Sequence, residues 1–598
     1  MLSYRKLAMR VLGRPLHTEG IDSPRPASQR AAAFILTAVM LTTLAAPAFA
    51  GTWSIENGDI TVKAGETGND VTQNNVTTKN DTDTIITNSD KDTASSHTVT
   101  IETNDKNDTV EVTLDNVNIK ADSGSALTSK GDVTLTLKGD NSLTGGNGGS
   151  GISSSGSLTI SGGENNSLTA QGGSGSGIFS SGGVTISGGT VNATGGSSSG
   201  GSDSGDGIHS GSLTISGGTV TATGGSGADG SGGSGIRTFN SGGVTISGGT
   251  VNATGGNGGT GENSNGGSGI YIYSSSGSLT VSGGTVTANG GSGGGNGGDG
   301  ISSTNTTISG GSTVTANGGN GGSLVGGDGI RSGGGLTVSD GTVTAKGGNG
   351  DSKDGYGGDG IRSGGVVTIS GNTVNAAGGY GGKVGGYGIC SFDRVAISGG
   401  TVEAAGGNGS TGGGSGIYSS VIDLSGSLEL TAKAGSPNGK ALSQKGSELV
   451  LDTIKDKLGP GAKVTATDAN GETKQVSIPR PVEPEEPSSS SDGGSATPST
   501  PASPLPGLTV TDKSGAVISY TSTQSGNTLT VCVGRFTASL RASLSALRQL
   551  RAEGIETITF QTILCSTTLS VDELLAMGGE DAEAVLTHRL TDSSLTVG

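Results

Sequence analysis

The sequence predicts an all-β protein whose main part is a right-handed parallel β-helix (a solenoid), preceded by an N-terminal cap and followed by a small α+β domain. The first observation is a phrase ending in Gly-Ile that returns at intervals of roughly 25 to 35 residues, a range typical of solenoid repeats. The second is that apolar and polar residues alternate in short runs within each repeat, as in β-strands. The third is that turn-forming Gly, Ser and Asn separate these runs.

Residues 1–50 are predicted to be a secretory signal peptide. A basic segment precedes an apolar run from Ala31 to Ala50, which ends in the cleavage-type sequence Ala48-Phe49-Ala50. The mature chain would then begin at Gly51, be secreted or attached to the cell surface, and keep no membrane span. A retained anchor is the alternative, because the basic segment is unusually long.

Composition bounds both the fold and the partners. Apolar residues make up 30% of the 598-residue chain, which is too few for a large globular core. The 120 glycines permit disorder on composition alone. The net charge is −17, with 34 Lys and Arg against 51 Asp and Glu, and this argues against nucleic acid as a partner because phosphates need a basic surface. The sequence gives no oligomeric state.

Residues 51–96, with Trp53, Ile55 and Ile60, are expected to cap the first rung, because an uncovered end exposes a strand edge. The β-helix itself is expected over residues 97–470. The equivalent isoleucines of its repeats are Ile152, Ile178, Ile208, Ile236, Ile270, Ile301, Ile330, Ile361, Ile389 and Ile417.

One rung is expected to hold three short strands. Ile208 is followed by Leu213 and Ile215 and then by Val220 and Ala222, and a polar residue separates the members of each pair. Such a coil cannot bury its apolar side chains alone, but it can do so against the coils above and below it.

A variable loop is expected once in every rung. The segment between the last Ala of one rung and the next Gly-Ile changes in length, whereas the strand part stays nearly constant. We therefore expect all loops on one edge, where deletions would be tolerated. A disordered low-complexity polymer is the alternative, although it has no reason to keep the spacing of its apolar positions.

The end of the chain changes in composition. Residues 478–507 are rich in Pro and Ser and are predicted to be a semi-rigid linker. Residues 508–598 are predicted to form an α+β domain of unknown role. Strands are expected around LTVTD, AVISYTST, NTLTVCV and ETITFQTI, and a helix over FTASLRASLSALRQLRAEG.

Two details of this domain follow from local patterns. Ser570 and Glu573 fit a capping box at the start of a second, short helix. Cys532 and Cys565 could pair within the domain, which would leave Cys390 without a partner.

The residue after each rung isoleucine should point outward, and aligned rungs would bring these residues into one column with a spacing of about 4.8 Å. Aromatic side chains there can stack on sugar rings, and arginine can hold uronate carboxylates. The alternative is that exposed strand positions simply favour aromatic and long side chains. The candidate carbohydrate-binding residues are Phe179, His209, Arg237, Tyr271, Arg331, Arg362 and Tyr418.

A second column stands two residues before the isoleucine. Asp299, Asp328 and Asp359 occupy it on consecutive rungs, and Asp206 occupies it earlier. Stacked carboxylates repel one another, so either the arginines of the outward column neutralise them or a cation such as Ca²⁺ binds among them. Asp299, Asp328 and Asp359 are therefore candidate metal ligands, and neutralisation by arginine is the favoured alternative.

The passage TVEVTLDNVNIKADSGSALTSKGDVTLTLKG, continued by LTISGG and TVNATGG units, resembles the secreted carbohydrate-binding β-helix proteins of anaerobic Gram-positive bacteria. The resemblance covers about residues 51 to 450 and implies binding of plant polysaccharides and of calcium. It shows no defined motif that can be matched position by position, so no residue role is transferred from it.

These observations together lead us to expect a secreted, noncatalytic polysaccharide-binding protein. A structural stalk or adhesin that displays Gly-rich loops to a protein partner is the alternative. A polysaccharide lyase or glycoside hydrolase is a third possibility, because β-helical enzymes use Asp, Lys or Arg on a rung face. Against catalysis, no catalytic motif is found, and the histidines are scattered at His17, His97, His209 and His588.

Overall fold

The computed structural model describes residues 50–104, 108–239, 242–274, 276–479, 508–512, 516–518, 520–533, 537–562, 566–577, 583–588 and 593–597. The chain divides into two compact units between Val482 and Glu483. The predicted signal peptide, apart from Ala50, and residues 480–507 of the predicted linker lie outside the described residues. None of the helices that the structure describes is both long enough and apolar enough to cross a membrane.

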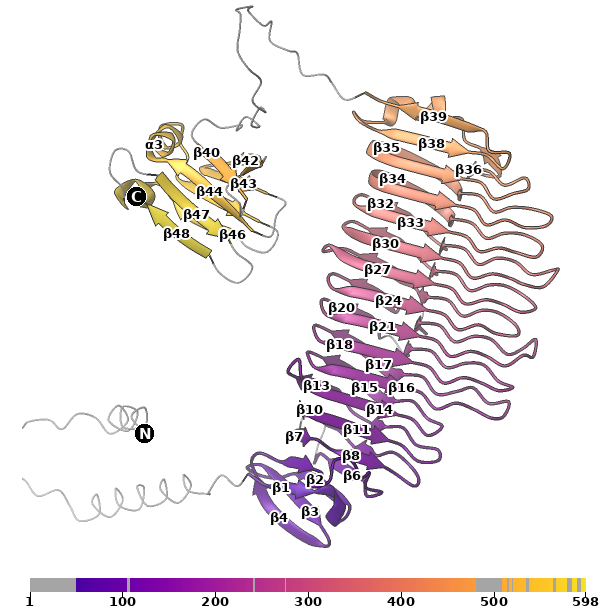
Figure 1. Ribbon diagram of the computed structural model, residues 1–598, viewed down its shortest axis with the longest axis vertical. Coiled ribbons are helices and arrows are strands. Elements are labelled where there is room, and N and C mark those ends of the chain that lie inside the picture. The colour runs from indigo at the N-terminus through magenta and orange to yellow at the C-terminus, as the bar shows by residue number, and fades with distance from the viewer. Residues whose placement is uncertain are drawn as a thin grey trace, which may run out of the picture. The chain divides into compact units, whose positions relative to one another are not determined.

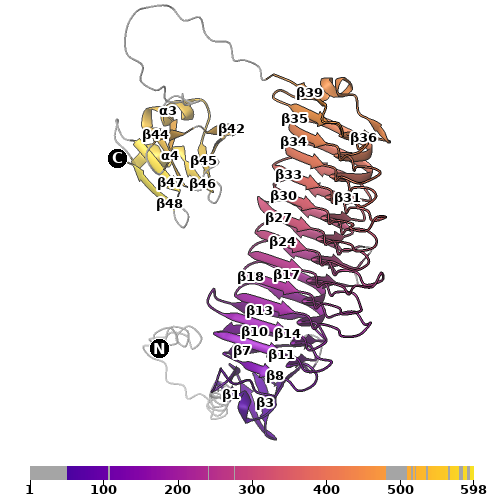
Figure 2. The ribbon, with the colours of Figure 1, turned by 45° about the vertical axis from the view of Figure 1, so that its right-hand side comes forward.

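The first unit is a parallel β-solenoid of about 16 turns, which confirms the predicted fold class. Each coil runs through three strand positions in a fixed order, and each strand pairs in parallel with the equivalent strand of the next coil. Three ladders therefore run along the stack (Figure 1), and Figure 2 shows the same stacking from another side. We call the ladder that carries the Gly-Ile phrase ladder A, and the two that follow it along the chain ladders B and C.

Ladder A begins each coil. Its strands are β2 (Ile60–Ala64), β6 (Val99–Glu102), β9 (Leu127–Ser129), β12 (Ile152–Ser154), β15 (Ile178–Ile186), β17 (Ile208–Ile215), β19 (Ile236–Thr238), β22 (Ile270–Ile272), β25 (Ile301–Ser303), β28 (Ile330–Ser332), β31 (Ile361–Ser363), β34 (Ile389–Ala405), β35 (Ile417–Lys433) and β36 (Leu442–Gln444). The long strands β15 and β17 continue into ladder B, and β34 and β35 continue through all three ladders.

Ladder B comes second in each coil. Besides the long strands, it contains β1 (Thr52–Ser54), β5 (Ile85–Thr87), β7 (Thr109–Asp115), β10 (Asp132–Lys138), β13 (Leu158–Gly162), β20 (Val244–Ile246), β23 (Ser278–Val281), β26 (Asn305–Ile308), β29 (Leu336–Val338) and β32 (Val367–Ile369).

Ladder C comes third and precedes the loop. Besides β34 and β35, it contains β8 (Asn118–Lys120), β11 (Asp140–Thr144), β14 (Ser167–Gln171), β16 (Thr190–Thr194), β18 (Thr219–Thr223), β21 (Thr250–Thr254), β24 (Thr285–Asn289), β27 (Ser312–Asn317), β30 (Gly341–Lys346), β33 (Thr373–Ala377) and β38 (Lys463–Thr467).

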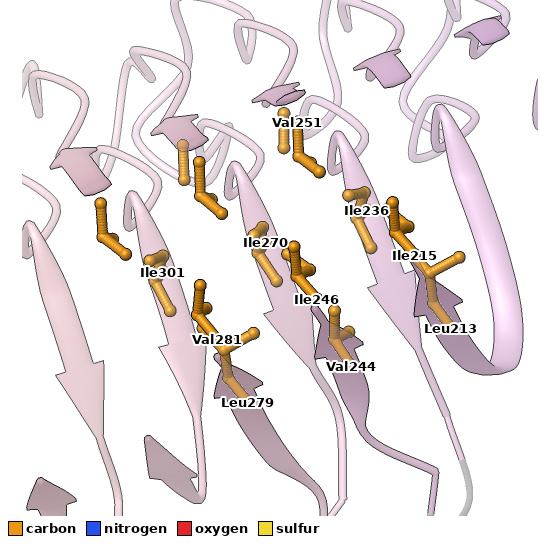
Figure 3. Packing of buried hydrophobic residues seen from close by; sticks show 14 of the residues in the cluster. Leu213, Ile215, Ile236, Val244, Ile246, Val251, Ile270, Leu279, Val281 and Ile301 are labelled. Atoms are coloured by element: carbon orange, nitrogen blue, oxygen red, sulfur yellow. The ribbon is translucent and has the colours of Figure 1, made fainter. Parts of the chain in front are cut away.

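The apolar side chains of the three ladders form one continuous core. Ile236, Val244, Ile246 and Val251 belong to a single coil, and each is 0% exposed. Figure 3 shows these residues beside their equivalents from neighbouring coils, such as Ile270. Because period-two alternation points every second side chain inward, each short strand supplies one or two core residues, and stacking covers the rest.

The corner between ladders B and C is a turn in which one residue has a positive φ angle. Gly218 and Gly249, the second glycines of their SGGT sequences, have φ values of 78° and 79°. Side chains other than glycine and asparagine rarely adopt this conformation. Asn372 takes the same place in the sequence ISGNT with a φ of 61°, so asparagine replaces glycine in this turn without a change of conformation.

Buried serines stabilise the bend between ladders A and B by hydrogen bonds to the backbone of the preceding coil. The Ser363 hydroxyl donates a hydrogen bond to the Gly334 carbonyl of the preceding coil at 2.7 Å, and Ser391 donates to Gly365 at 2.8 Å. Both serines are 0% exposed. The hydroxyls thus satisfy carbonyls at a bend where the regular ladder is interrupted.

The glycine-rich loops stack on one another instead of standing free. The Gly319 N–H donates to the Gly298 carbonyl of the preceding loop at 2.8 Å, and the Gly327 N–H donates to the Gly319 carbonyl of its own loop at 2.8 Å. A Cβ atom on Gly319 would lie 2.0 Å from the Gly291 carbonyl oxygen. The expectation that deletions are tolerated in these loops is thereby limited to their tips, because the glycine stretches at their bases are backbone-paired.

Antiparallel strands cover both ends of the stack. At the N-terminal end, β3 (Asn69–Gln73) pairs with β2, and β4 (Val76–Asp81) pairs with β3. At the C-terminal end, β37 (Ser447–Glu448) pairs with β36, and β39 (Thr473–Ser477) pairs with β38, with a 3₁₀ helix at Leu451–Lys457 between them. These strands occupy edges that would otherwise be open to other chains.

Parallel stacking begins earlier than residue 97, where we expected the β-helix to start. β1 pairs in parallel with β5, β5 with β7, and β2 with β6. The segment 51–96 therefore supplies the first coils, with a 3₁₀ helix at Ile55–Asn57, and only β3 and β4 act as a separate cap. At the other end, the Ile478 N–H donates to the Ala462 carbonyl at 2.9 Å, so Ile478 belongs to the solenoid instead of the linker.

The described residues of the second unit form two small sheets and two helices. The five-stranded sheet has the order β41-β40-β44-β47-β48, and the four-stranded sheet the order β42-β43-β45-β46. The strands are β40 (Leu508–Thr511), β41 (Val517–Ile518), β42 (Thr521–Ser525), β43 (Thr528–Cys532), β44 (Ala538–Ser543), β45 (Thr557–Gln561), β46 (Ser566–Ser570), β47 (Glu583–His588) and β48 (Ser593–Val597). The helices are α3 (Leu544–Ala552) and α4 (Val571–Met577).

The predicted first helix of this unit is shorter than its leucine pattern suggested. Leu540 lies in strand β44, and α3 begins only at Leu544, after Ser543 caps it by accepting a hydrogen bond from the Ala546 N–H at 3.2 Å. Alternation in Ala538–Ser543 suits a strand that pairs with β40 and β47, and this pairing overrides helical periodicity. The Ser570 hydroxyl accepts from the Glu573 N–H at 3.4 Å, which is one of the two hydrogen bonds of the predicted capping box. Cys565 lies outside the described residues.

Replacing Val338 with Asp should strongly destabilise the solenoid, because an unpaired carboxylate would enter an interior where Val338 is 0% exposed and stacked between Ile308 and Ile369. We expect a loss of roughly 3 kcal/mol or more, measured as a lower urea midpoint. Thr337→Asp is the matched control, since Thr337 is exposed on the same strand. Equal losses in both variants would contradict the assignment of inward and outward positions.

Gly319→Ala should lower the melting temperature of the solenoid, because the new methyl group cannot fit against the Gly291 carbonyl. Gly200→Ala is the matched control in another loop, where an added Cβ would meet nothing within 4 Å. Circular dichroism melts of the two variants test this difference, and a Gly319→Ala variant as stable as Gly200→Ala would mean that the loops are not closely stacked.

Candidate functional site

The residues that follow the rung isoleucines lie in one column on the outer side of ladder A. Neighbours in this column are strand partners: Phe179 pairs with His209, Arg331 with Arg362, and Cys390 with Tyr418. Ladder A thus brings together all seven predicted carbohydrate-binding residues, although they are spread over some 240 residues of sequence. In order along the stack the column is Phe179, His209, Arg237, Tyr271, Ser302, Arg331, Arg362, Cys390 and Tyr418.

Exposure along this column is uneven. Arg331 is exposed, whereas Phe179, His209, Tyr271 and Tyr418 are half-buried. Cys390 is only 1% exposed, although its position in the strand alternation faces outward. Its short side chain lies between the longer ones of Arg362 and Tyr418, its partners in the column.

A second outward column, three residues after the isoleucine, was missed by the sequence reasoning. It contributes Phe239, Tyr273 and Phe392, of which Tyr273 is 62% exposed and Phe392 is 55% exposed. The signal was present, because inward and outward positions continue to alternate in Ile-Arg-Thr-Phe, Ile-Tyr-Ile-Tyr and Ile-Cys-Ser-Phe. We call the two columns together the ladder A face.

Three rings gather toward the N-terminal part of this face. The His209 ring stands edge-on to Phe179 and to Phe239, with centroid distances of 5.5 and 5.0 Å, and the two phenyl rings are parallel at 6.3 Å. Burial, and then the Arg237 charge, lower the pKa of His209 to about 4. His209 is therefore a neutral aromatic ring near neutral pH and not a cation.

Arg237 links these rings to a pair of tyrosines. Its guanidinium carbon lies 5.6 Å from the Tyr271 ring centroid and 5.9 Å from that of Tyr273, and Nη1 lies 4.0 Å from an oxygen of Asp206. The Tyr271 and Tyr273 rings are 5.9 Å apart. Phe179, His209, Phe239, Tyr271 and Tyr273 form what we call the N-terminal aromatic cluster.

A smaller group of rings lies further along the stack. The Tyr387 and Tyr418 rings are stacked with centroids 4.9 Å apart, and the Arg362 guanidinium lies 5.4 Å from the Phe392 centroid. Burial raises the pKa of Tyr387 and of Cys390 to about 12, so both groups stay neutral. Tyr387, Phe392 and Tyr418 form the C-terminal aromatic cluster.

The predicted aspartates hold the coils in register. Asp299 accepts a hydrogen bond from the Asp328 N–H at 2.8 Å, Asp328 from the Asp359 N–H at 2.8 Å, and Asp359 from the Tyr387 N–H at 2.7 Å. Asp206 accepts from the Ser234 N–H at 2.6 Å in the same way. Each carboxylate thus satisfies a backbone donor of the next coil.

In the loops, asparagine side chains accept the same kind of hydrogen bond from a backbone N–H of the next coil. Asn320 accepts from the Asn349 N–H at 2.9 Å, and Asn349 accepts from the Tyr380 N–H at 2.9 Å. Because asparagine serves as well as aspartate for this purpose, the capping role alone does not require a negative charge. The recurrence of Asp or Asn at one repeat position was the sequence signal for these caps.

Burial perturbs the carboxylates. Asp328 is 5% exposed and Asp359 is 4% exposed. Burial raises the pKa of Asp359 to about 6, although the hydrogen bond from Tyr387 and the charge of Arg362 act in the opposite direction. For Asp328, burial and then the neighbouring carboxylates of Asp299 and Asp359 raise the pKa well above its ordinary value.

Arginine partly neutralises this column. Arg362 Nη1 lies 3.5 Å from the second oxygen of Asp359, in line with the favoured alternative of the sequence analysis. Among the described residues, no group of three or more His, Cys, Asp or Glu side chains is arranged to hold a metal ion. The calcium site at Asp299, Asp328 and Asp359 stays a prediction.

Comparison with known proteins adds no family assignment. No protein-family model matches the chain, and neither a curated protein nor a solved structure matches it.

Asp328→Asn should raise the melting temperature at pH 7.5 and change it little at pH 4.0. The folded protein holds the Asp328 proton more tightly than the unfolded chain does, whose aspartate pKa is about 3.9. The raised pKa therefore adds its full contribution to the free energy of unfolding below about pH 4, and this contribution is lost as pH rises through the pKa of Asp328 in the folded protein. Asparagine removes the charge and keeps the acceptor oxygen.

Asp229→Asn is the control, because it removes a charge from an exposed loop residue. It should leave the melting temperature unchanged at both pH 7.5 and pH 4.0. An Asp328→Asn variant that is less stable at pH 7.5 than the unaltered protein would show that the arginines outweigh burial.

Proposed function

We propose that this protein is a secreted or cell-surface, noncatalytic polysaccharide-binding protein. The observation that carries the proposal is the in-register arrangement of aromatic rings and guanidinium groups along the ladder A face. Aromatic rings present an apolar surface on which sugar rings stack, and guanidinium groups donate to hydroxyl and carboxylate oxygens.

The dimensions of the face suit an extended chain of sugars. Tyr271 and Tyr418 are separated by five coil steps, through Ser302, Arg331, Arg362 and Cys390. At the usual strand spacing of about 4.8 Å, this separation is about 24 Å, which is long enough for several sugar units. A polymer lying along the stack would contact both aromatic clusters.

The burial of the aspartate carboxylates and their hydrogen bonds to the backbone support the noncatalytic part of the proposal. General acid–base catalysis requires groups within hydrogen-bond reach of the substrate. Asp206, Asp328 and Asp359 are at most 5% exposed, and each already accepts a backbone N–H. The extracellular part of the proposal depends on the signal-peptide pattern in residues 1–50.

The loop edge favours a second candidate function, a stalk or adhesin that contacts a protein partner. Leu324, Tyr356 and Tyr380 lie on three successive loops and are 47%, 42% and 48% exposed. The Lys383 amine lies 5.5 Å from the centroid of the Tyr356 ring. Exposed tyrosine and leucine side chains on neighbouring loops are typical of interaction surfaces.

Combined replacement of Tyr273 and Phe392 with Ala should weaken polysaccharide binding roughly tenfold, because each lost ring removes a stacking surface. Binding of the full chain to a glycan array, followed by titration with the best ligand, measures the effect. Tyr380→Ala removes a similarly exposed ring from the loop edge and should leave affinity unchanged. Binding to no polysaccharide would reject the proposal in favour of the stalk, and loss of binding in Tyr380→Ala alone would place the site on the loops.

A further inference from the structure

The arginines of the ladder A face are held in different ways. Arg362 Nη1 lies 3.5 Å from Asp359, and its guanidinium covers the Phe392 ring. Arg237 lies beside Asp206 and against the rings of Tyr271 and Tyr273. The charge of each is therefore opposed by a carboxylate within the protein, and one face of each is occupied by an aromatic ring.

Arg331 differs from both. It is exposed, and in the part of the chain that the structure describes, its guanidinium makes no direct ion pair, hydrogen bond or aromatic ring contact, although its charge acts over a longer distance on the buried carboxylates of Asp299 and Asp359. All five of its N–H donors are available to a ligand, in the planar geometry that matches a carboxylate with two parallel hydrogen bonds.

The position of Arg331 adds to this argument. It lies two coil steps after Tyr271 and two before the coil that carries Phe392, or about 10 Å from each along the stack. Its neighbours in the column are Ser302, which is small and uncharged, and Arg362. A chain whose rings rest on both aromatic clusters would therefore pass directly over an available guanidinium.

We propose that Arg331 is the residue that makes this face select acidic polysaccharides, and that Arg237 and Arg362 support the aromatic rings instead of contacting the acid groups. This inference rests on the proposed function. In this proposal, Arg331 alone recognises a uronate carboxylate. The sequence pattern does not distinguish Arg331 from Arg237 and Arg362, because all three follow a rung isoleucine.

The test uses two forms of one polymer, polygalacturonate and the same chain with its carboxyl groups methyl-esterified, titrated against the full-length protein at low salt. Arg331→Gln should weaken binding of polygalacturonate roughly tenfold or more, because it removes a charge-assisted, bidentate contact. It should leave affinity for the methyl ester unchanged. Arg331→Lys keeps the positive charge but loses the planar pair of N–H donors. Its affinity for polygalacturonate should lie between those of the unaltered protein and Arg331→Gln.

Two further variants separate this role from a general loss of charge or of structure. Lys346→Gln removes an exposed positive charge from ladder C of the same coil, and it should bind both polymers as the unaltered protein does. Arg362→Gln should change binding of both polymers by the same factor, because it affects the support of Phe392 and not the contact with the acid. The melting temperature of Arg331→Gln should match that of the unaltered protein.

The outcomes are distinct. If Arg362→Gln or Lys346→Gln selectively loses polygalacturonate as Arg331→Gln does, or if Arg331→Gln has no effect, the assignment of specificity to Arg331 is wrong while the proposed function stands. If the unaltered protein binds neither form but binds another polysaccharide on the glycan array, this inference fails while the proposed function stands. If it binds no polysaccharide on the array, the proposed function fails and this inference fails with it. Selective loss in Arg331→Gln alone supports both.

Discussion

The constraint on which the structure depends is the parallel register between equivalent residues of successive coils. Ile330, Leu336 and Val343 pair with Ile361, Val367 and Val374 in the three ladders. A slip of one residue would turn every core side chain outward, because strand side chains alternate. Each coil has too few apolar residues for a core of its own, so correct register is what converts a chain with 30% apolar residues into a continuously buried interior.

The same register extends beyond the strands. Loop glycines donate to carbonyls of the preceding loop, and Asp and Asn side chains cap the N–H groups of the next coil. A polar side chain that repeats at one position therefore acts as a rung-to-rung connection, in addition to the backbone ladder. Because these connections join nearest neighbours only, a local fault affects the adjoining coils most strongly.

Register also creates the candidate site. Phe179 and Tyr418 are far apart in sequence, but the ladder brings both onto one face. How each side chain behaves there depends on its neighbours: His209 is neutral between two phenyl rings, Arg362 is paired with Asp359, and Arg331 is exposed. The same column position thus holds an aromatic ring in some coils, a paired arginine in another and an exposed arginine without a direct partner in a third.

The sequence by itself determined the solenoid, the inward positions and the column of outward residues, because a period-two pattern repeated at equivalent positions permits few other folds. It did not determine that parallel coils begin at Thr52, that Cys390 is buried or that Ala538–Ser543 is a strand. It also did not distinguish Arg331 from Arg362 or assign the aspartates to capping. Those features depend on which side chains from neighbouring coils or strands come within a few ångströms, and such contacts exist only after tertiary pairing has placed residues distant in sequence side by side.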